Sequence, residues 1–350
     1  LLSFIIVFSA KIKLEWTHNW WPELLALAIL VPLTRLISSV VPMVMSVVAL
    51  FLVSTAMHYF LYIRRPDATR LSGYFLWISA GGAIGGIVGN LVPPIFLNSS
   101  KEYFYILLLM CIALAIWENK RIFAWFSRVP IWVGSPRLVV WLFPLVFLVF
   151  FLRPGANVVV EDRNIYGTLK IKDELVDGRL IRRMEHGRTQ HGNAFLDEAR
   201  AKATAYYYHG GGIHQVHQVL REQRSPSPLS IGLIGLGAGT MAEYVEVGDT
   251  MLVYELNSMV VEMAREYFPF LKQSREPVQI EVGDGLHLLG NSSLVFDVLT
   301  VDAFSGDAVP LNLLTLEAMD VYFAHLEEDG MLVFHVTNRH FAFAPIIGRA

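Results

Sequence analysis

In the second half of this sequence, a glycine or an acidic residue directly follows each of several short apolar runs. Such runs, separated by longer amphipathic segments, predict strands that alternate with helices and form a parallel sheet. Ligands bind such sheets outside the carboxyl ends of the strands. We therefore expect the residues at these strand ends to form a ligand site. They are, in chain order, Gly235, Glu255, Gly283 with Asp284, and Asp302.

A glycine-rich loop follows the first of these strands, with Gly235, Gly237 and Gly239 at alternate positions. Glycine lets the backbone pass close to a ligand at the N-terminus of the following helix, which we expect from about Thr240. The same pattern also occurs in tight turns that bind nothing. Glu255 favours a ligand site, because an acid at the end of the second strand accepts hydrogen bonds from ribose hydroxyls.

The expected ligand is a single nucleoside with an uncharged or cationic tail. Thr240 stands where the dinucleotide-binding fingerprint has a glycine, so a pyrophosphate is not expected. Asp284 lies between Gly283 and Gly285 and suits an adenine amino group. A turn aspartate without a ligand would have the same neighbours in sequence.

The composition divides the chain into an apolar half and an ordinary half. Hydrophobic residues make up 54% of the 350 residues and charged residues 17%, which is too apolar for one soluble globule. The net charge of −3, without a basic stripe, argues against nucleic acid as a partner. The single cysteine, Cys111, lies in an apolar run, so we expect neither disulfides nor a metal site.

The apolar half predicts a multi-span helical region in a lipid bilayer. Four runs approach the roughly 20 residues that a span needs, namely 22–38, 40–62, 71–97 and 103–117. Gly81, Gly85 and Gly89 would line one helix face and allow close helix packing. The run 138–152 is shorter and contains Pro144, so we expect it to be re-entrant or interfacial, which leaves the C-terminal half in the cytoplasm.

The predicted domains are a transmembrane region over 1–155, a small β domain over 156–225 and a Rossmann-like nucleoside-binding domain over 226–350. Because the sequence begins and ends inside apparent elements, we expect it to be part of a longer protein. In the β domain we expect a polar loop over 185–192, a helix over 206–220 and a linker over 221–229. The expected strands are 157–160, 166–171, 180–184, 231–234, 251–254, 278–282, 297–301 and 331–336.

Taken in order, the runs IGLIGLGAGT, VYELNSMVVEMARE, VGDGLHLL, FDVLTVDAFSGDAVP and LEEDGMLVFHVTN resemble spermidine synthase-like proteins, the polyamine aminopropyltransferases. The run HYFLYIRRPDATRLSGYFLWISAGGAIGG resembles bacterial proteins in which membrane spans are fused to such a domain. The resemblance implies a sheet of the S-adenosylmethionine-dependent methyltransferase type, truncated at its C-terminus. It also implies a multi-pass protein of the bacterial inner membrane and a homodimer.

The resemblance further implies aminopropyl transfer from decarboxylated S-adenosylmethionine to a diamine such as putrescine. Asp302 matches the catalytic acid. The positions implied to bind the donor are Gln190, Gly235, Gly237, Gly239, Glu255, Asp284 and Gly285. Those implied to face the acceptor are Tyr207, His209 and Asp307.

The chemistry of a sulfonium donor agrees with an acid at position 302. Attack on the carbon beside sulfur needs a neutral amine, whereas a diamine is protonated in water, with a pKa near 10.4 as for lysine. A carboxylate in hydrogen-bond reach can hold the amine and accept its proton. Asp302 could also simply cap the following turn. In the glycine loop, Ala238 stands where the family has an acid that binds the donor's amine.

Two other functions therefore stay open. One is a different S-adenosylmethionine-dependent transferase, such as a methyltransferase, which Ala238 favours. The other is a non-catalytic sensor that binds a nucleoside or a polyamine.

Overall fold

The computed structural model describes residues 2–9, 40–98, 102, 105, 106, 109, 157–187, 189–198, 200–303 and 310–335. The chain forms two compact units, Leu1–Pro154 and Gly155–Ala350. Each unit is described by itself below. The expected membrane segments 22–38 and 138–152, most of 103–117, and Asp307 lie outside the described residues.

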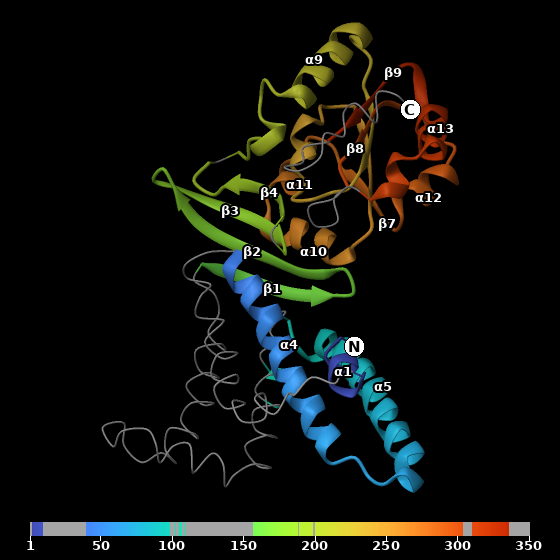
Figure 1. Ribbon diagram of the computed structural model, residues 1–350. Coiled ribbons are helices and arrows are strands. Elements are labelled where there is room, and N and C mark those ends of the chain that lie inside the picture. The colour runs from blue at the N-terminus through green and yellow to red at the C-terminus, as the bar shows by residue number, and fades with distance from the viewer. Residues whose placement is uncertain are drawn as a thin grey trace. The chain divides into compact units, whose positions relative to one another are not determined.

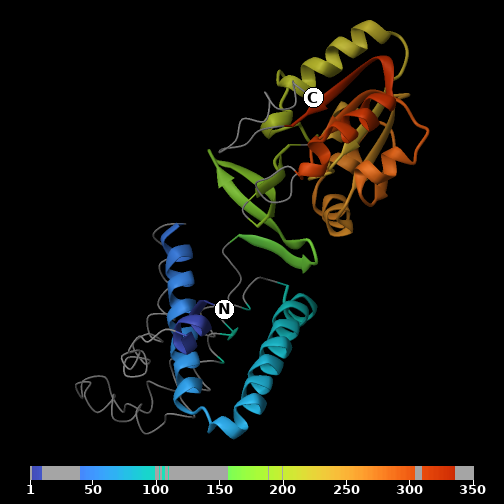
Figure 2. The ribbon, with the colours of Figure 1, turned by 45° about the vertical axis from the view of Figure 1, so that its right-hand side comes forward.

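The first unit is helical. Helix α1 (Leu2–Ser9) packs against α4 (Val40–Ile63), where Ser3 Oγ lies 3.1 Å from His58 Nδ1. A short connection that includes a 3-10 helix (Ala68–Arg70) leads into α5 (Leu71–Phe96). Figures 1 and 2 show α4 and α5 running in opposite directions from this connection.

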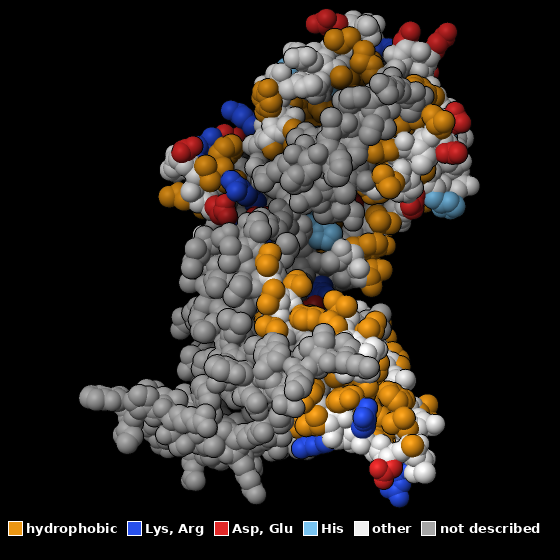
Figure 3. Space-filling model, in the orientation of Figure 1, with side chains coloured by type: hydrophobic (Ala, Val, Ile, Leu, Met, Phe, Trp, Pro, Cys, Tyr) orange, Lys and Arg blue, Asp and Glu red, His pale blue; other side chains and the backbone are white. Residues whose placement is uncertain are grey.

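Within the described part of the chain, one helix, Ala68–Phe96, is long and apolar enough to cross a membrane, and Val47–Ile63 is a shorter apolar helix. Trp77 and Phe96 of α5 are 78% and 73% exposed. Hydrophobic side chains cover much of the described helical surface in Figure 3. The expected multi-span region is not supported by the described residues, which contain this one candidate span.

The expected close packing along the α5 glycines is not observed among the described residues. A Cβ atom placed on Gly81, Gly85 or Gly89 would meet no described atom within 4 Å. The stripe therefore remains a sequence pattern without an assigned neighbour.

The second unit begins with an antiparallel sheet in the order β1-β2-β3-β4. Asp177 and Gly178 both have positive φ and form the hairpin turn predicted between the second and third strands. The polar segment 185–192 was expected to be a loop, which is wrong, because most of it belongs to β3 and β4 around a turn at Gly187. Charged partners explain its polarity, since Lys172 pairs with Glu185 over 2.6 Å on β2 and β3. The strands are β1 (Val158–Asn164), β2 (Gly167–Val176), β3 (Arg179–His186) and β4 (Thr189–Phe195).

A five-stranded parallel sheet follows in the order β7-β6-β5-β8-β9. The chain moves outward from β5 to β7 and then crosses to β8 on the other side of β5. The carboxyl ends of β5 and β8 therefore flank the topological switch point, where doubly wound sheets bind ligands. The strands are β5 (Ser230–Ile234), β6 (Thr250–Glu255), β7 (Val278–Val282), β8 (Phe296–Val301) and β9 (Leu326–Phe334).

Both faces of this sheet are covered at its central strands β5, β6 and β8, which are buried on both sides. In β6, Met251 and Val253 belong to one buried cluster, and Leu252 and Tyr254 belong to another. The first cluster includes side chains of α9 (Gly212–Arg224) and α10 (Ser258–Tyr267). The second includes side chains of α12 (Gly285–Gly290) and α13 (Leu316–Ala324).

The antiparallel sheet shares the first of these cores. Leu169, Ile171 and Met184 are fully buried in the same cluster as Val253 and Val261. The two sheets therefore stabilise one another, and the glycine loop is held in place against the antiparallel sheet.

Three sequence expectations about helices need correction. The helix expected from Thr240 is a short 3-10 helix (Thr240–Tyr244). The helix expected over 206–220 is divided into a 3-10 turn (Ala205–Tyr207) and α9, which begins at Gly212. The linker expected from residue 221 begins later, since α9 continues to Arg224.

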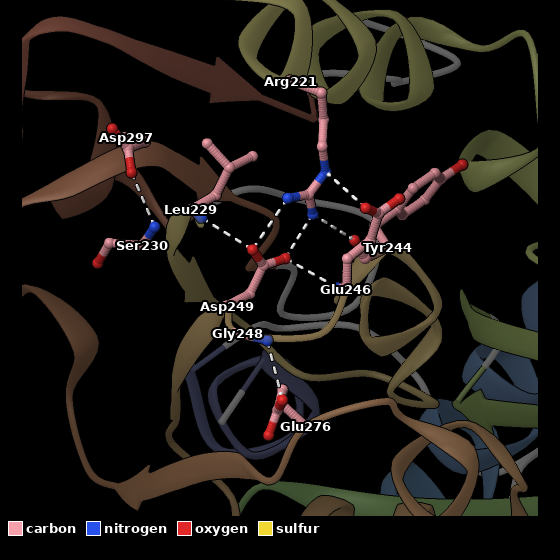
Figure 4. A network of polar contacts seen from close by, with 9 residues as sticks. All are labelled: Arg221, Leu229, Ser230, Tyr244, Glu246, Gly248, Asp249, Glu276 and Asp297. Atoms are coloured by element: carbon pink, nitrogen blue, oxygen red, sulfur yellow. Dashed lines mark hydrogen bonds and ion pairs between the residues drawn. The ribbon is translucent and has the colours of Figure 1, made fainter. Parts of the chain in front are cut away.

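A polar network explains why α9 continues. Arg221 donates to both carboxylate oxygens of the buried Asp249, and one of these bonds measures 2.9 Å. Asp249 also accepts the backbone amides of Leu229 and Glu246, each over 2.8 Å (Figure 4). Burial raises the pKa of Asp249, but these hydrogen bonds outweigh it and lower the pKa overall. The network fixes α9 to the starts of β5 and β6, at the edge opposite the strand ends.

Candidate functional site

The carboxyl ends of three neighbouring strands meet at one edge of the parallel sheet. Ile234 pairs with Tyr254 on one side and with Val301 on the other. Gly235 N donates to Tyr254 O, and Asp302 N donates to Ile234 O, each over 2.8 Å. The glycine loop therefore starts between the end of β6 and the end of β8.

The glycine loop needs its glycines for both conformation and space. Gly235, Gly237 and Gly239 have φ values of +98°, +54° and +81°, which side chains rarely adopt. A Cβ atom on Gly235 would overlap the carbonyl oxygen of Asp302. One on Gly237 would overlap the carbonyl oxygen of His191.

Glu255 is 9% exposed and turns its carboxylate toward the glycine loop. Its Oε2 accepts the backbone amide of Leu236 over 2.8 Å, and its Oε1 accepts that of Asn257 over 2.9 Å. Burial raises the pKa of Glu255, and the backbone hydrogen bonds partly oppose this. A carboxylate has about four lone-pair positions, and backbone amides including that of Leu256 contact three of them, so one position is left for a ligand hydroxyl.

Asp284 is the N-cap of α12, where its Oδ1 accepts the amide of His287 over 2.9 Å. Asp284 therefore caps a helix, which agrees with the alternative that it is a turn aspartate. Gly285 is buried, and a Cβ atom there would lie 2.7 Å from Ile234 Cγ2. The backbone after β7 therefore packs directly against the end of β5.

Asp302 is hydrogen-bonded to three side chains. Its Oδ2 accepts the hydroxyl of Tyr206 over 2.9 Å and also that of Tyr207. Its Oδ1 lies 2.6 Å from Nδ1 of His335. The Asp302 side chain is 7% exposed. An ionised carboxylate can remain in such a buried place because polar donors replace water.

The two tyrosines act as hydrogen-bond donors rather than as bases. Burial raises the pKa of Tyr206, and the negative charge of Asp302 raises it further. The same causes, in the same order, raise the pKa of Tyr207 well above its ordinary value. Both hydroxyls therefore keep their protons at neutral pH and point those protons at the carboxylate of Asp302.

Of the residues expected to face the acceptor substrate, the structure places only some near Asp302. Tyr207 contacts Asp302, whereas His209 Nε2 lies 3.0 Å from Glu243 Oε1 and is half exposed. Gln190 is an exposed residue of β4, paired with Glu185. Asp307 lies outside the described residues.

Three further residues belong to this site and were not predicted. Tyr206 stacks on His335, with ring centroids 3.7 Å apart, and both contact Asp302. His335 directly follows β9, but the strand predicted over 331–336 included it, so the strand-end rule did not point to it. His191 has no comparable signal, because its position depends on the contact between the two sheets.

Strand β4 covers the side of the glycine loop where the family has an acid. The amide of Ala238 donates to His191 O over 2.9 Å, and Ala238 is 1% exposed. A Cβ atom on Gly192 would lie 2.6 Å from the Cβ of Ala238. Burial, and then the nearby His186, lower the pKa of His191 to about 4, so its ring is neutral at physiological pH. The space beside Ala238 is thus filled by protein and carries no charge.

No group of three or more metal-ligating side chains that could hold an ion occurs in the described ranges. The arrangement instead defines a class of protein, namely a doubly wound α/β fold with a glycine loop, a strand-end acid and a tyrosine-held aspartate at its switch point. These features suit a nucleoside-containing ligand and proton transfer next to it.

Comparisons with known proteins point in the same direction. No family model matches the chain. The chain is 23% identical over 203 residues to the polyamine aminopropyltransferase of Thermoanaerobacter sp. The aligned region covers 54% of this chain and 70% of that protein. It is 29% identical over 122 residues to polyamine aminopropyltransferase 1 of Bacillus cereus. This aligned region covers 33% of this chain and 44% of that protein.

Solved structures with similar folds have low scores. Spermidine synthase from Thermotoga maritima matches with a TM-score of 0.30 and 18% identity, over 52% of this chain and 64% of that one. Human methyltransferase-like protein 13 in complex with SAH matches with a TM-score of 0.33 and 17% identity, over 39% of this chain and 68% of that one. The fold class stated here depends on the strand order and not on these matches.

Proposed function

We propose that this protein is an aminopropyltransferase that moves an aminopropyl group from decarboxylated S-adenosylmethionine to a diamine such as putrescine. The observation that carries the proposal is Asp302, a buried carboxylate held by two tyrosine hydroxyls beside the glycine loop. The similarity to curated polyamine aminopropyltransferases supports the same reaction class.

The glycine loop and Glu255 would bind the nucleoside part of the donor. Gly235 and Gly237 leave the backbone without side chains, and Glu255 keeps one lone-pair position for a ribose hydroxyl. Gly285 brings the start of α12 close to the same strand ends, where Asp284 would meet the adenine amino group. Gln190, on strand β4, would face the donor from the other sheet.

Asp302 would hold the acceptor amine and take its proton. The neutral nitrogen forms a bond to the carbon beside the sulfonium, and the carbon–sulfur bond breaks with its electron pair going to sulfur. The products are the elongated amine and methylthioadenosine, a neutral thioether. The amine proton passes to Asp302 and then to water. Tyr206 and Tyr207 orient the carboxylate and stay protonated throughout.

We further propose that the protein is anchored in the bacterial inner membrane, with the sheets in the cytoplasm where nucleoside donors are made. The apolar helix Ala68–Phe96 supports the anchor. If the expressed chain is released from membranes by alkaline carbonate without detergent, the anchor is wrong.

A methyltransferase is the second candidate, and Ala238 is the observation that favours it. Ala238 is buried under β4 and offers no carboxylate for the primary amine of a decarboxylated donor. In that case S-adenosylmethionine would be the donor and S-adenosylhomocysteine the product.

One assay separates the candidates. The purified full-length chain is incubated with either donor and with putrescine, and the nucleoside products are quantified by mass spectrometry. Release of methylthioadenosine that depends on putrescine supports aminopropyl transfer. Release of S-adenosylhomocysteine supports the methyltransferase. Binding of either donor without any product supports a sensor and contradicts the proposed enzyme.

A further inference from the structure

His335 contacts the proposed base but has no part in the chemistry described so far. We infer that His335 is a positioning residue, which fixes the Asp302 carboxylate through Nδ1 and directs the acceptor amine to the remaining acceptor position on Asp302 Oδ1. This inference rests on the proposed function and names how its acceptor site is organised.

The imidazole of His335 is fixed from several directions. The backbone amide of His335 donates to Val301 O over 3.0 Å, which places the residue beside the end of β8. Its Nδ1 lies 2.6 Å from Asp302 Oδ1, and its ring stacks on Tyr206 with an interplanar angle of 22°. The His335 side chain is 17% exposed. A ring held in this way restricts the rotamer of the carboxylate it contacts.

The hydrogen bonds to Asp302 decide where an amine can bind. A carboxylate offers about four lone-pair positions, two on each oxygen. Tyr206 and Tyr207 occupy those of Oδ2. His335 occupies one of Oδ1, so the other position of Oδ1 is left for the acceptor. The amine would therefore bind Asp302 on the same oxygen as His335.

The tyrosines and His191 beside Asp302 carry no charge that would repel a cationic amine. Tyr206 and Tyr207 stay neutral because their pKa values are raised, and His191 stays neutral because its pKa is lowered to about 4. Glu255 interacts with Asp302 at longer range.

Two substitutions of His335 separate the effect of its hydrogen bond to Asp302 from the effect of its side-chain volume. The amide nitrogen of His335→Asn can donate from nearly the place of Nδ1, whereas His335→Leu keeps volume without a donor. We expect His335→Leu to lower kcat about 100-fold, as small misplacements of reacting groups do. His335→Asn should recover most of that loss, because its amide can still donate to the carboxylate. Donor affinity should be unchanged in both.

His325→Asn is the matched control. His325 is also buried and hydrogen-bonded through both ring nitrogens, but it precedes β9 and does not contact Asp302. It should keep the wild-type kcat. Wild-type kcat in His335→Leu, or equal losses in His335→Asn and His335→Leu, would overturn the inference.

A second measurement does not require turnover. In the histidine-¹⁵N-labelled full chain, nuclear magnetic resonance reports which ring nitrogen carries the proton, and the signal missing in His335→Asn identifies His335. We expect the Nδ1–H tautomer, and finding Nε2–H in the neutral ring would overturn the inference. If the wild type transfers no aminopropyl group, the proposed function is wrong. The tautomer of His335 then decides by itself whether this residue donates a hydrogen bond to Asp302.

Discussion

The backbone amide of Ala238 donates to the carbonyl oxygen of His191 over 2.9 Å. This hydrogen bond joins the glycine loop of the parallel sheet to an edge strand of the antiparallel sheet. The shape of the proposed nucleoside site therefore depends on a strand that lies outside the parallel sheet.

Gly192→Ala tests this dependence. The new Cβ would lie 2.6 Å from that of Ala238, in a residue with φ of +130°. Gly178→Ala is the matched control, because Gly178 also has positive φ but would meet no atom within 4 Å. The control should lose about 1–2 kcal/mol of stability from backbone strain alone. Gly192→Ala should lose more and should also weaken donor binding, both measured on the full chain by chemical unfolding and calorimetry. Equal effects of the two substitutions would mean that β4 does not support the loop.

Asp302→Asn should remove the base while leaving the donor site intact. The amide keeps the size of the carboxylate but cannot accept the amine proton. We expect kcat to fall by about 10²–10⁴-fold, the usual range for a general base. The donor dissociation constant should change less than about threefold, because the tyrosines still fill the space. Full activity in Asp302→Asn would show that the assigned base is wrong.

Glu255→Gln should weaken donor binding rather than slow chemistry. The Glu255 carboxylate already accepts hydrogen bonds from the backbone amides of Leu236 and Asn257. The glutamine side chain has a single acceptor oxygen, so it cannot accept both of these hydrogen bonds and one from a ribose hydroxyl as well. A lost hydrogen bond to a charged group costs about 1.5–3 kcal/mol, or a dissociation constant raised roughly ten- to a hundredfold. Isothermal titration with the donor measures this. An unchanged dissociation constant together with a reduced kcat would move Glu255 from binding to catalysis.

Arg221→Met should destabilise the fold without touching the site. It leaves the buried Asp249 charge without its partner, which costs about 3–5 kcal/mol. Arg179→Met is the control, since Arg179 and Asp197 form a more exposed pair, and exposed ion pairs contribute little to stability. Urea unfolding compares them, and similar losses would show that the Asp249 network is not structurally important.

The same network should give the protein an acid-sensitive stability. The pKa of Asp249 is lower in the folded state than in the unfolded chain, where an aspartate has a pKa of about 3.9. Its contribution is therefore present above that value and is lost as pH falls through the folded pKa. Asp249→Asn should reduce the slope of stability against pH below about pH 5. An unchanged slope would assign acid sensitivity to other carboxylates.

The central strands of the parallel sheet could be predicted closely from sequence because they are apolar on both faces, whereas β9 (Leu326–Phe334) begins five residues before the predicted 331–336. The run 278–282 is β7 as expected, and Asp302 follows β8 as expected. Local sequence patterns were enough to locate these strands, because turn residues flank each apolar run. They failed for Thr240–Tyr244, where a left-handed Gly239 and the short path to β6 replace the expected helix with a 3-10 turn.

The contacts of the site could not be predicted in the same way. Tyr206 and Tyr207 reach Asp302 across 96 and 95 residues of sequence, because the two sheets share one core. The 185–192 segment has a polar composition typical of a loop, yet its strands pair through backbone bonds and surface ion pairs. Such features depend on tertiary packing, which hydrophobic periodicity does not describe.

The most direct test of the strand-end site is the binding of methylthioadenosine, the nucleoside product, to the full-length chain. Calorimetry should find one site per chain, weakened at least tenfold in Glu255→Gln and retained in Asp302→Asn. If the wild type does not bind this nucleoside, or if Glu255→Gln binds it as tightly as the wild type, the switch point of this sheet is not a nucleoside site.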